Sequence, residues 1–75
     1  MRYNIYLRPE PEGGFTVVVP ALPGCITWGK DVYEARRMAV DAIEAYVASL
    51  IEQHEPVPGD NDGLVASVEV SVSHG

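Results

Sequence analysis

The side chains that could carry catalysis are few and scattered along this sequence of 75 residues. A two-metal nuclease needs several carboxylates that converge on divalent ions about 4 Å apart. Here the acidic residues fall in a predicted hairpin turn, along a predicted helix and in a polar loop, and only Glu69 lies in the middle of a predicted strand. This distribution favours solvated acidic side chains, and we expect no metal-dependent nuclease.

The sequence also has few histidine and cysteine side chains that could bind a metal or act in catalysis. His54 and His74 are the only histidines, and Cys25 is the only cysteine. Their spacing does not match that of zinc ligands, and nothing local supplies Cys25 with a base and an orienting group. Gly13 and Gly14 lie in a turn and not before a helix, so no phosphate-binding loop is expected. We predict no catalytic residue, no metal and no cofactor, with Cys25 acting as a small hydrophobic side chain.

Five basic residues are the remaining candidates for a binding site. Arg2 and Arg8 lie at the two ends of one predicted strand face with Tyr6 between them, a combination that can bind single-stranded nucleic acid. The 11 acidic residues and the formal net charge of −6 would repel a polyanion. We therefore favour a solubilising role for the two arginines, expect no direct DNA binding, and expect a basic protein partner.

The elements that must position these residues begin with a β-hairpin. Residues 3–8 and 15–19 alternate in polarity with the period of two of half-buried strands, and residues 9–14 between them are rich in proline and glycine. Prolines at 20 and 23 end the second strand. Residues 25–28 are too few to fix which side chains share a face, but they predict a short third strand.

A helix over residues 31–53 is the clearest predicted element. Asp31 precedes Glu34 by the spacing of a capping box, which makes Asp31 the predicted N-cap. Apolar side chains follow at steps of three and four, which predicts one buried stripe made of Ala35, Met38, Ala39, Ala42, Ile43, Tyr46, Val47 and Leu50. Pro56 bars continuation of the helix, and a last strand is expected at 64–72, where every second residue is apolar.

The predicted architecture is α+β, with the order β-β-β-α-β and one helix packed on one face of a four-stranded sheet. The crossover helix should make the last strand parallel to a neighbour. The other face of the sheet carries Tyr6 and Val18, together with Trp28, and these three residues are the candidate oligomer or partner face. Residues 1–75 are expected to form a single domain, because the chain is too short for two cores.

The small size of the chain predicts self-association and a cytoplasmic location. A core of this size supplies only about 3–5 kcal/mol, and a single cysteine allows no internal disulfide, so we expect a homo-oligomer. A lone thiol suits a reducing compartment. Residues 1–14 lack the layout of a signal peptide, and no apolar run approaches the ~20 residues of a membrane span.

Residues 15–29, which read FTVVVPALPGCITWG, resemble the signature of the HicB-like antitoxin family, formerly UPF0150. That signature is an alternating strand, then Pro-Asp-Leu-Pro-Gly-Cys, a short strand and Gly-Asp-Thr-x-x-Glu-Ala. Glu34-Ala35 supplies the last step here, and Pro56-Val57-Pro58 is similar to the family's exit from the helix. Ala21 stands in place of the usual Asp, and Lys30-Asp31 in place of Asp-Thr.

The resemblance implies a degenerate ribonuclease-H-like core and an antitoxin that binds and blocks a small basic HicA-type mRNA interferase. Many members add a C-terminal DNA-binding domain. This sequence ends directly after its last predicted strand, so that domain and operator binding are not expected. Two alternatives stay open: a homo-oligomeric HicB-like domain with another partner or ligand, and, with the least support, a ribonuclease-H-like hydrolase.

Overall fold

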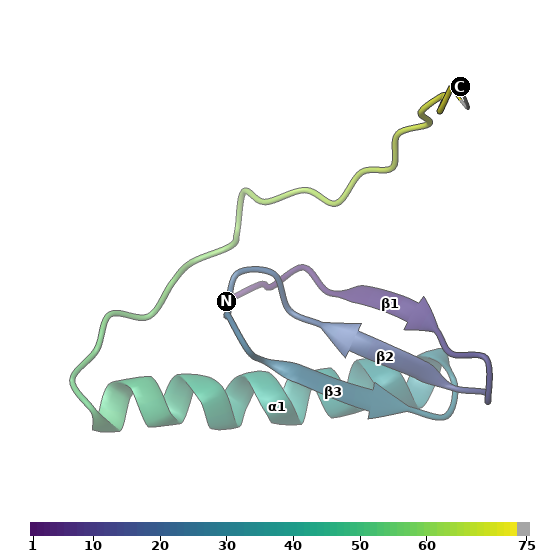
Figure 1. Ribbon diagram of the computed structural model, residues 1–75. Helices are drawn as coiled ribbons and strands as arrows, with labels where there is room; N and C mark the ends of the chain where they lie inside the picture. The colour runs from purple at the N-terminus through teal and green to yellow at the C-terminus, as the bar shows by residue number, and fades with distance from the viewer. Residues whose placement is uncertain (74–75) are drawn as a thin grey trace.

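The structure, a computed structural model, describes residues 1–73 as three short strands followed by one long helix. The strands are β1 (Tyr6–Pro9), β2 (Phe15–Val18) and β3 (Ile26–Gly29), and the helix is α1 (Val32–Glu52). The sheet is antiparallel with the order β1-β2-β3, and α1 lies across one face of it (Figure 1). The predicted α+β class is confirmed.

Strand pairing determines which side chains face the helix. Val17 pairs with Leu7 on one side and with Thr27 on the other, and it packs against alanines of α1, so this row points inward. Because successive side chains of a strand alternate between faces, the neighbouring row that contains Val18 points outward. The sheet therefore has one face on the core and one face toward solvent.

The hydrophobic core is small and consists of two adjoining clusters. One joins Val17 of β2 to Ala35 and Ala39 of α1. The other lies under the loop between β2 and β3, where Leu22 is fully buried and packs with two further buried residues, Val19 and Cys25. The loop is held by backbone hydrogen bonds, including one of 2.9 Å from the Cys25 N–H to the Leu22 carbonyl. Each core residue therefore carries a large share of the stability of this chain.

Gly29 ends β3 directly against the first turn of α1. A Cβ built on Gly29 would overlap the backbone N and Cα of Ala35. Backbone atoms cannot move aside as a flexible side chain can, so the close approach of helix and sheet requires a glycine at this position.

The N-terminus of α1 is capped by side chains. The carboxylate of Asp31 accepts a hydrogen bond of 2.7 Å from the Glu34 N–H, and the Glu34 carboxylate accepts one of 2.9 Å from the Lys30 N–H. These two bonds satisfy backbone donors that have no partner within the helix. The observed α1 differs from the predicted helix only at its two capping residues.

Replacing Asp31 with alanine should lower the free energy of unfolding by about 0.5–2 kcal/mol, because the Glu34 N–H loses its acceptor. Urea melts of the parent and the variant at one protein concentration measure the change. Asp41→Ala is a matched control, since Asp41 is an exposed acid in the middle of α1 and its loss changes the net charge by the same amount. Equal melts for the two variants would show that the cap adds no stability.

Unlike its N-terminus, the C-terminus of α1 has no charged side chain that compensates the helix dipole. His54 adopts a left-handed backbone conformation with φ of 59°, and Glu55 donates its N–H to the Leu50 carbonyl at 2.9 Å. This arrangement usually places glycine at the left-handed position. The last turn of α1 contains no basic residue and ends on Glu52, so the negative end of the helix dipole has no compensating charge there.

The predicted fourth strand is not formed in this single chain, and the expectation of a four-stranded sheet is not confirmed. Within residues 1–73 the sheet has three strands. Residues 64–73, here called the tail, are extended and exposed, and they project away from the domain (Figure 1). The expected ribonuclease-H-like fold is therefore not confirmed either.

Hydrogen bonds hold the segment just before the tail. Asp60 accepts a hydrogen bond of 2.8 Å from the Asn4 N–H, and the Asn4 side chain donates one of 2.7 Å to the Gly63 carbonyl. Arg2 adds a bond of 2.7 Å from its guanidinium to the Asn61 carbonyl. These contacts, here called the exit clamp, hold residues 60–63 against the segment before β1 and set the direction in which the tail leaves.

Candidate interaction surfaces

The structure brings the three predicted partner-face residues together on the side of the sheet opposite α1. Tyr6 pairs with Val18, Val18 pairs with Ile26, and Trp28 stands two residues farther along β3. Tyr6 and Trp28 are each 49% exposed and Ile26 is 60% exposed. These four residues are here called the outer sheet face. The sequence did not predict Ile26 on this face, because its side of the third strand is determined only by the register of that strand with β2.

Trp28 is fixed in place by the hairpin turn. A Cβ on Gly14 would overlap the indole ring, and Gly14 has a φ of 77°, which only glycine adopts without strain. The ring thus lies against the turn and still exposes about half of its surface. An aromatic side chain held in one position loses little conformational entropy on binding, which suits it as an anchor for a partner.

Polar groups at the hairpin border this face. The Glu10 carboxylate accepts hydrogen bonds from the Thr16 hydroxyl at 2.8 Å and from the Arg8 guanidinium at 3.1 Å. These hydrogen bonds hold the pKa of the Glu10 carboxyl below its usual value, and the bond from the Thr16 hydroxyl has the larger effect. Glu10 therefore stays ionised to lower pH than a free glutamate, and the charge of Arg8 is partly neutralised.

The structure does not join the two arginines into a nucleic-acid patch. Arg8 is paired with Glu10 at 3.1 Å. Arg2 belongs to the exit clamp, where its backbone N–H also donates to the Asn61 side chain at 3.1 Å. Each arginine thus has a partner within the chain, and the structure does not test the solubilising role expected for both.

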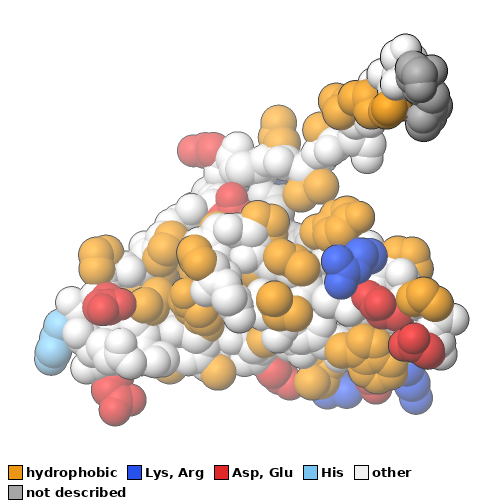
Figure 2. Space-filling model, in the orientation of Figure 1, with side chains coloured by type: hydrophobic (Ala, Val, Ile, Leu, Met, Phe, Trp, Pro, Cys, Tyr) orange, Lys and Arg blue, Asp and Glu red, His pale blue; other side chains and the backbone are white. Residues whose placement is uncertain are grey.

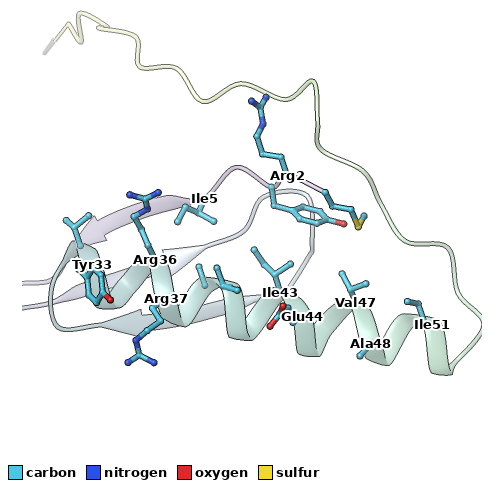
Figure 3. A pocket seen from close by; sticks show the side chains of 15 residues that line it. Arg2, Ile5, Tyr33, Arg36, Arg37, Ile43, Glu44, Val47, Ala48 and Ile51 are labelled. Carbon is cyan, nitrogen blue, oxygen red and sulfur yellow. The ribbon is translucent and has the colours of Figure 1, made fainter.

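A second surface is an open groove between α1 and the segment that leads into β1, with a volume of about 1280 Å³ (Figure 3). We call it the helix groove. Tyr33, Val40 and Ile51 of α1 lie along it and are 79%, 55% and 62% exposed. Its lining is Met1, Arg2, Tyr3, Ile5, Val32, Tyr33, Arg36, Arg37, Ala39, Val40, Ile43, Glu44, Val47, Ala48 and Ile51.

This groove was missed because the predicted buried stripe already accounted for the amphipathic pattern of the helix. Apolar residues at 33, 40, 48 and 51, next to Val47 of the stripe, form a second set at helical spacing on an adjacent side of α1. A helix with apolar residues on two adjacent sides has more apolar surface than one side of a small sheet can cover. This excess of apolar surface on the helix was the sequence signal from which the groove could have been predicted.

The described part of the chain contains no group of three His, Cys, Asp or Glu side chains that could hold a metal ion. Cys25 is 5% exposed, and burial raises the pKa of its thiol. His54 lies at the end of α1, whereas His74 is outside the described residues. No helix within residues 1–73 is both long enough and apolar enough to cross a membrane.

The model of the HicB-like antitoxin family of bacterial toxin–antitoxin systems matches residues 3–71. The chain belongs to the HicB-like antitoxin family. It is 43% identical over 61 residues to a UPF0150 protein of Thermoplasma acidophilum, covering 81% of this chain and 88% of that relative. It is 39% identical over 59 residues to a UPF0150 protein of Synechocystis, covering 79% of this chain and 75% of that relative.

Relatives named as antitoxins are longer than this HicB-like chain. It is 38% identical over 58 residues to the antitoxin HicB of Escherichia coli K12, covering 77% of this chain and 42% of that protein. An antitoxin HicB of Photorhabdus laumondii is 38% identical over 75 residues, covering 97% of this chain and 48% of that protein. The HicB-like chain thus spans about half of these antitoxins or less. The family match includes most of the tail.

Proposed function

We propose that this HicB-like chain is a non-enzymatic binding module that neutralises a small basic toxin of the HicA type. The observation that carries the proposal is the family match over residues 3–71, together with similarity to proteins named antitoxin HicB. A binding role also agrees with the character of the surfaces, which are apolar, exposed and bordered by charge.

The outer sheet face is the proposed docking site for the toxin. Tyr6 and Trp28 are the half-exposed aromatic side chains of this face, and aromatic anchors at the centre of an interface dominate binding energy. Glu12 lies in the hairpin at its border and adds negative charge, whereas the charge of Glu10 is offset by Arg8 at 3.1 Å. A positively charged partner would therefore meet apolar contacts at the centre and opposite charges at the rim.

Neutralisation is proposed to follow from competition with RNA. A toxin that cuts RNA must bind a polyanion through a positive surface. A protein with a formal net charge of −6 can occupy that surface and exclude the substrate. Complementary charge of this kind mainly raises the association rate and selects the partner.

Trp28→Ala should weaken binding of the candidate HicA-type toxin at least tenfold, because a central aromatic anchor is removed. Surface-based kinetics with the immobilised toxin measures the change. Tyr33→Ala is the matched control, since Tyr33 is an exposed aromatic side chain of the helix groove and not of the outer sheet face. Equal affinities for the two variants would remove the outer sheet face from the interface, and no binding by the parent chain would reject this toxin as a partner.

The same experiment across a salt series tests the electrostatic part of the proposal. The Debye length falls to about 8 Å at physiological salt, so the association rate should drop as salt rises while the dissociation rate changes little. An association rate that does not respond to salt would contradict charge mimicry and leave an apolar interface.

A homo-oligomeric state is also proposed, and it is the second candidate role if no toxin binds. The helix groove and the tail favour it, because both expose apolar side chains that the outer sheet face does not use. Figure 2 shows hydrophobic side chains over the visible face of the domain and along the projecting tail. Self-association would bury such surface without involving the proposed toxin site.

A further inference from the structure

We infer that two copies of this chain exchange their tails, so that residues 64–73 of one copy lie beside β1 of the other and place apolar side chains in its helix groove. This inference rests on the proposed self-association and gives it a specific interface. The exchanged tail would supply each sheet with the fourth strand that a single chain lacks.

The tail has the properties of a strand without a partner. The even-numbered residues of the tail are all apolar, whereas four of its five odd-numbered residues are polar, Val65 being the exception. Leu64, Val68 and Val70 are 91%, 85% and 77% exposed. An alternating strand of this kind is suited to lie with one face on a core and the other toward solvent. The family match through residue 71 makes most of this segment part of the domain that defines the family.

The receiving surface has the matching properties. β1 pairs only with β2 and forms one edge of the sheet, so its other side offers unpaired backbone groups. The helix groove opens beside the segment that leads into β1 and follows α1 (Figure 3). The 21 residues of α1 span about 31 Å at 1.5 Å per residue. An extended segment of ten residues spans about 33 Å, so the tail and the groove agree in length.

The charged residues of the groove and the tail are compatible with this pairing. Arg2, Arg36 and Arg37, three of the five basic residues of the chain, line the groove. Glu69 is the one charged residue of the tail. Glu69 shares the polar side of the tail with Ser71, so with the apolar side in the groove its carboxylate faces away from the apolar lining.

The course of the tail after the exit clamp agrees with a second copy as the partner. Asp60 and Gly63 are hydrogen-bonded to Asn4, immediately before β1. A Cβ on Gly63 would overlap the Asp60 carboxylate, so the turn is tightly closed. The chain leaves this turn directed away from its own sheet (Figure 1). The tail projects into solvent there, where the open β1 edge of a neighbouring copy can meet it while the clamp stays intact.

Val70→Asp should convert the assembly to monomers, because it places a charge on the apolar side of the tail. Light scattering at micromolar concentration should give about twice 8.1 kDa for the parent and 8.1 kDa for Val70→Asp. Ser71→Asp is the matched control: it adds the same charge at the next position, on the polar side, and should leave the dimer intact. Circular dichroism checks that all three chains keep their helix.

A dimer that survives Val70→Asp overturns tail exchange but leaves the proposed self-association standing. Loss of the dimer with both variants contradicts docking through the apolar side of the tail. A monomeric parent overturns self-association and exchange together. Toxin binding is measured separately, so none of these outcomes decides the proposed antitoxin role.

Cross-linking between different copies distinguishes exchange from a tail that folds back. A Val70→Cys chain is mixed with a Val40→Cys chain, equilibrated and treated with a short bismaleimide. Both chains keep Cys25, which is buried. The parent chain, treated in the same way, shows whether Cys25 itself forms cross-links. Exchange predicts a product that contains one chain of each variant. No such product in the mixture, with internal cross-linking in a diluted double variant, would overturn the inference.

Discussion

Replacing Gly29 with alanine should destabilise the protein by about 3 kcal/mol or more, at or above the top of the usual range for overpacking. The added Cβ overlaps the backbone N and Cα of Ala35, and no rotation of a side chain can relieve that contact. Either the first turn of α1 moves away from β3 or the strand bends. A core worth about 3–5 kcal/mol has little reserve, so the variant should be largely unfolded at 37 °C. Thermal melts followed by circular dichroism measure the effect.

Two other glycines are matched controls for this prediction. Gly59 has no atom within 4 Å of a built Cβ and no left-handed backbone, so Gly59→Ala should change the melt little. Gly24 also has open space, but its φ is 81°, so Gly24→Ala should show the cost of backbone strain without a clash. If Gly29→Ala melts at the same temperature as Gly59→Ala, the helix and the sheet are not in such close contact.

Replacing Leu22 with alanine should lower the free energy of unfolding by about 2–5 kcal/mol, which is most of what a domain of this size possesses. Leu22 is fully buried and packs with Val19 and Cys25 under the loop between β2 and β3. Truncation removes apolar contacts and leaves a cavity that the short loop, held by its own hydrogen bonds, cannot fill by collapsing. Urea melts at one protein concentration measure the loss.

Ile26→Ala is the control for Leu22→Ala. Ile26 lies only four residues away, but it is on the outer sheet face and is 60% exposed. Its truncation should cost no more than about 1 kcal/mol, the span of strand propensity. Similar losses for the two variants would show that the loop between β2 and β3 does not carry the core.

The helix and the hairpin could be predicted from the sequence because their signals are local. Asp31, Glu34 and the apolar stripe lie on the helix itself, and the expected helix over 31–53 corresponds to α1 with its two capping residues. Alternation and turn residues likewise place β1 and β2 near their observed positions. These features depend on neighbours in the chain and not on distant contacts.

The fourth strand and the helix groove could not be predicted, because they depend on what is available in space. Alternation from Leu64 to Val72 shows that the segment suits a sheet, but it does not say whether an open strand edge lies within reach. The contact of Asp60 with Asn4, 56 positions apart in the sequence, decides where the tail leaves, and no local pattern encodes it. The same holds for Ile26, whose face is fixed by pairing with Val18.

The end of α1 has a consequence for where the native structure opens. Its left-handed His54, its terminal Glu52 and the absence of a basic residue in the last turn all weaken that end, whereas the first turn is capped and packed on Gly29. Figure 2 shows acidic side chains and no Lys or Arg on the visible surface at that end. Proteins open locally where buried contacts are fewest, so backbone amides should exchange with solvent progressively faster from the first turn of α1 to the last. Fraying of that last turn would lengthen the connection between α1 and the exit clamp.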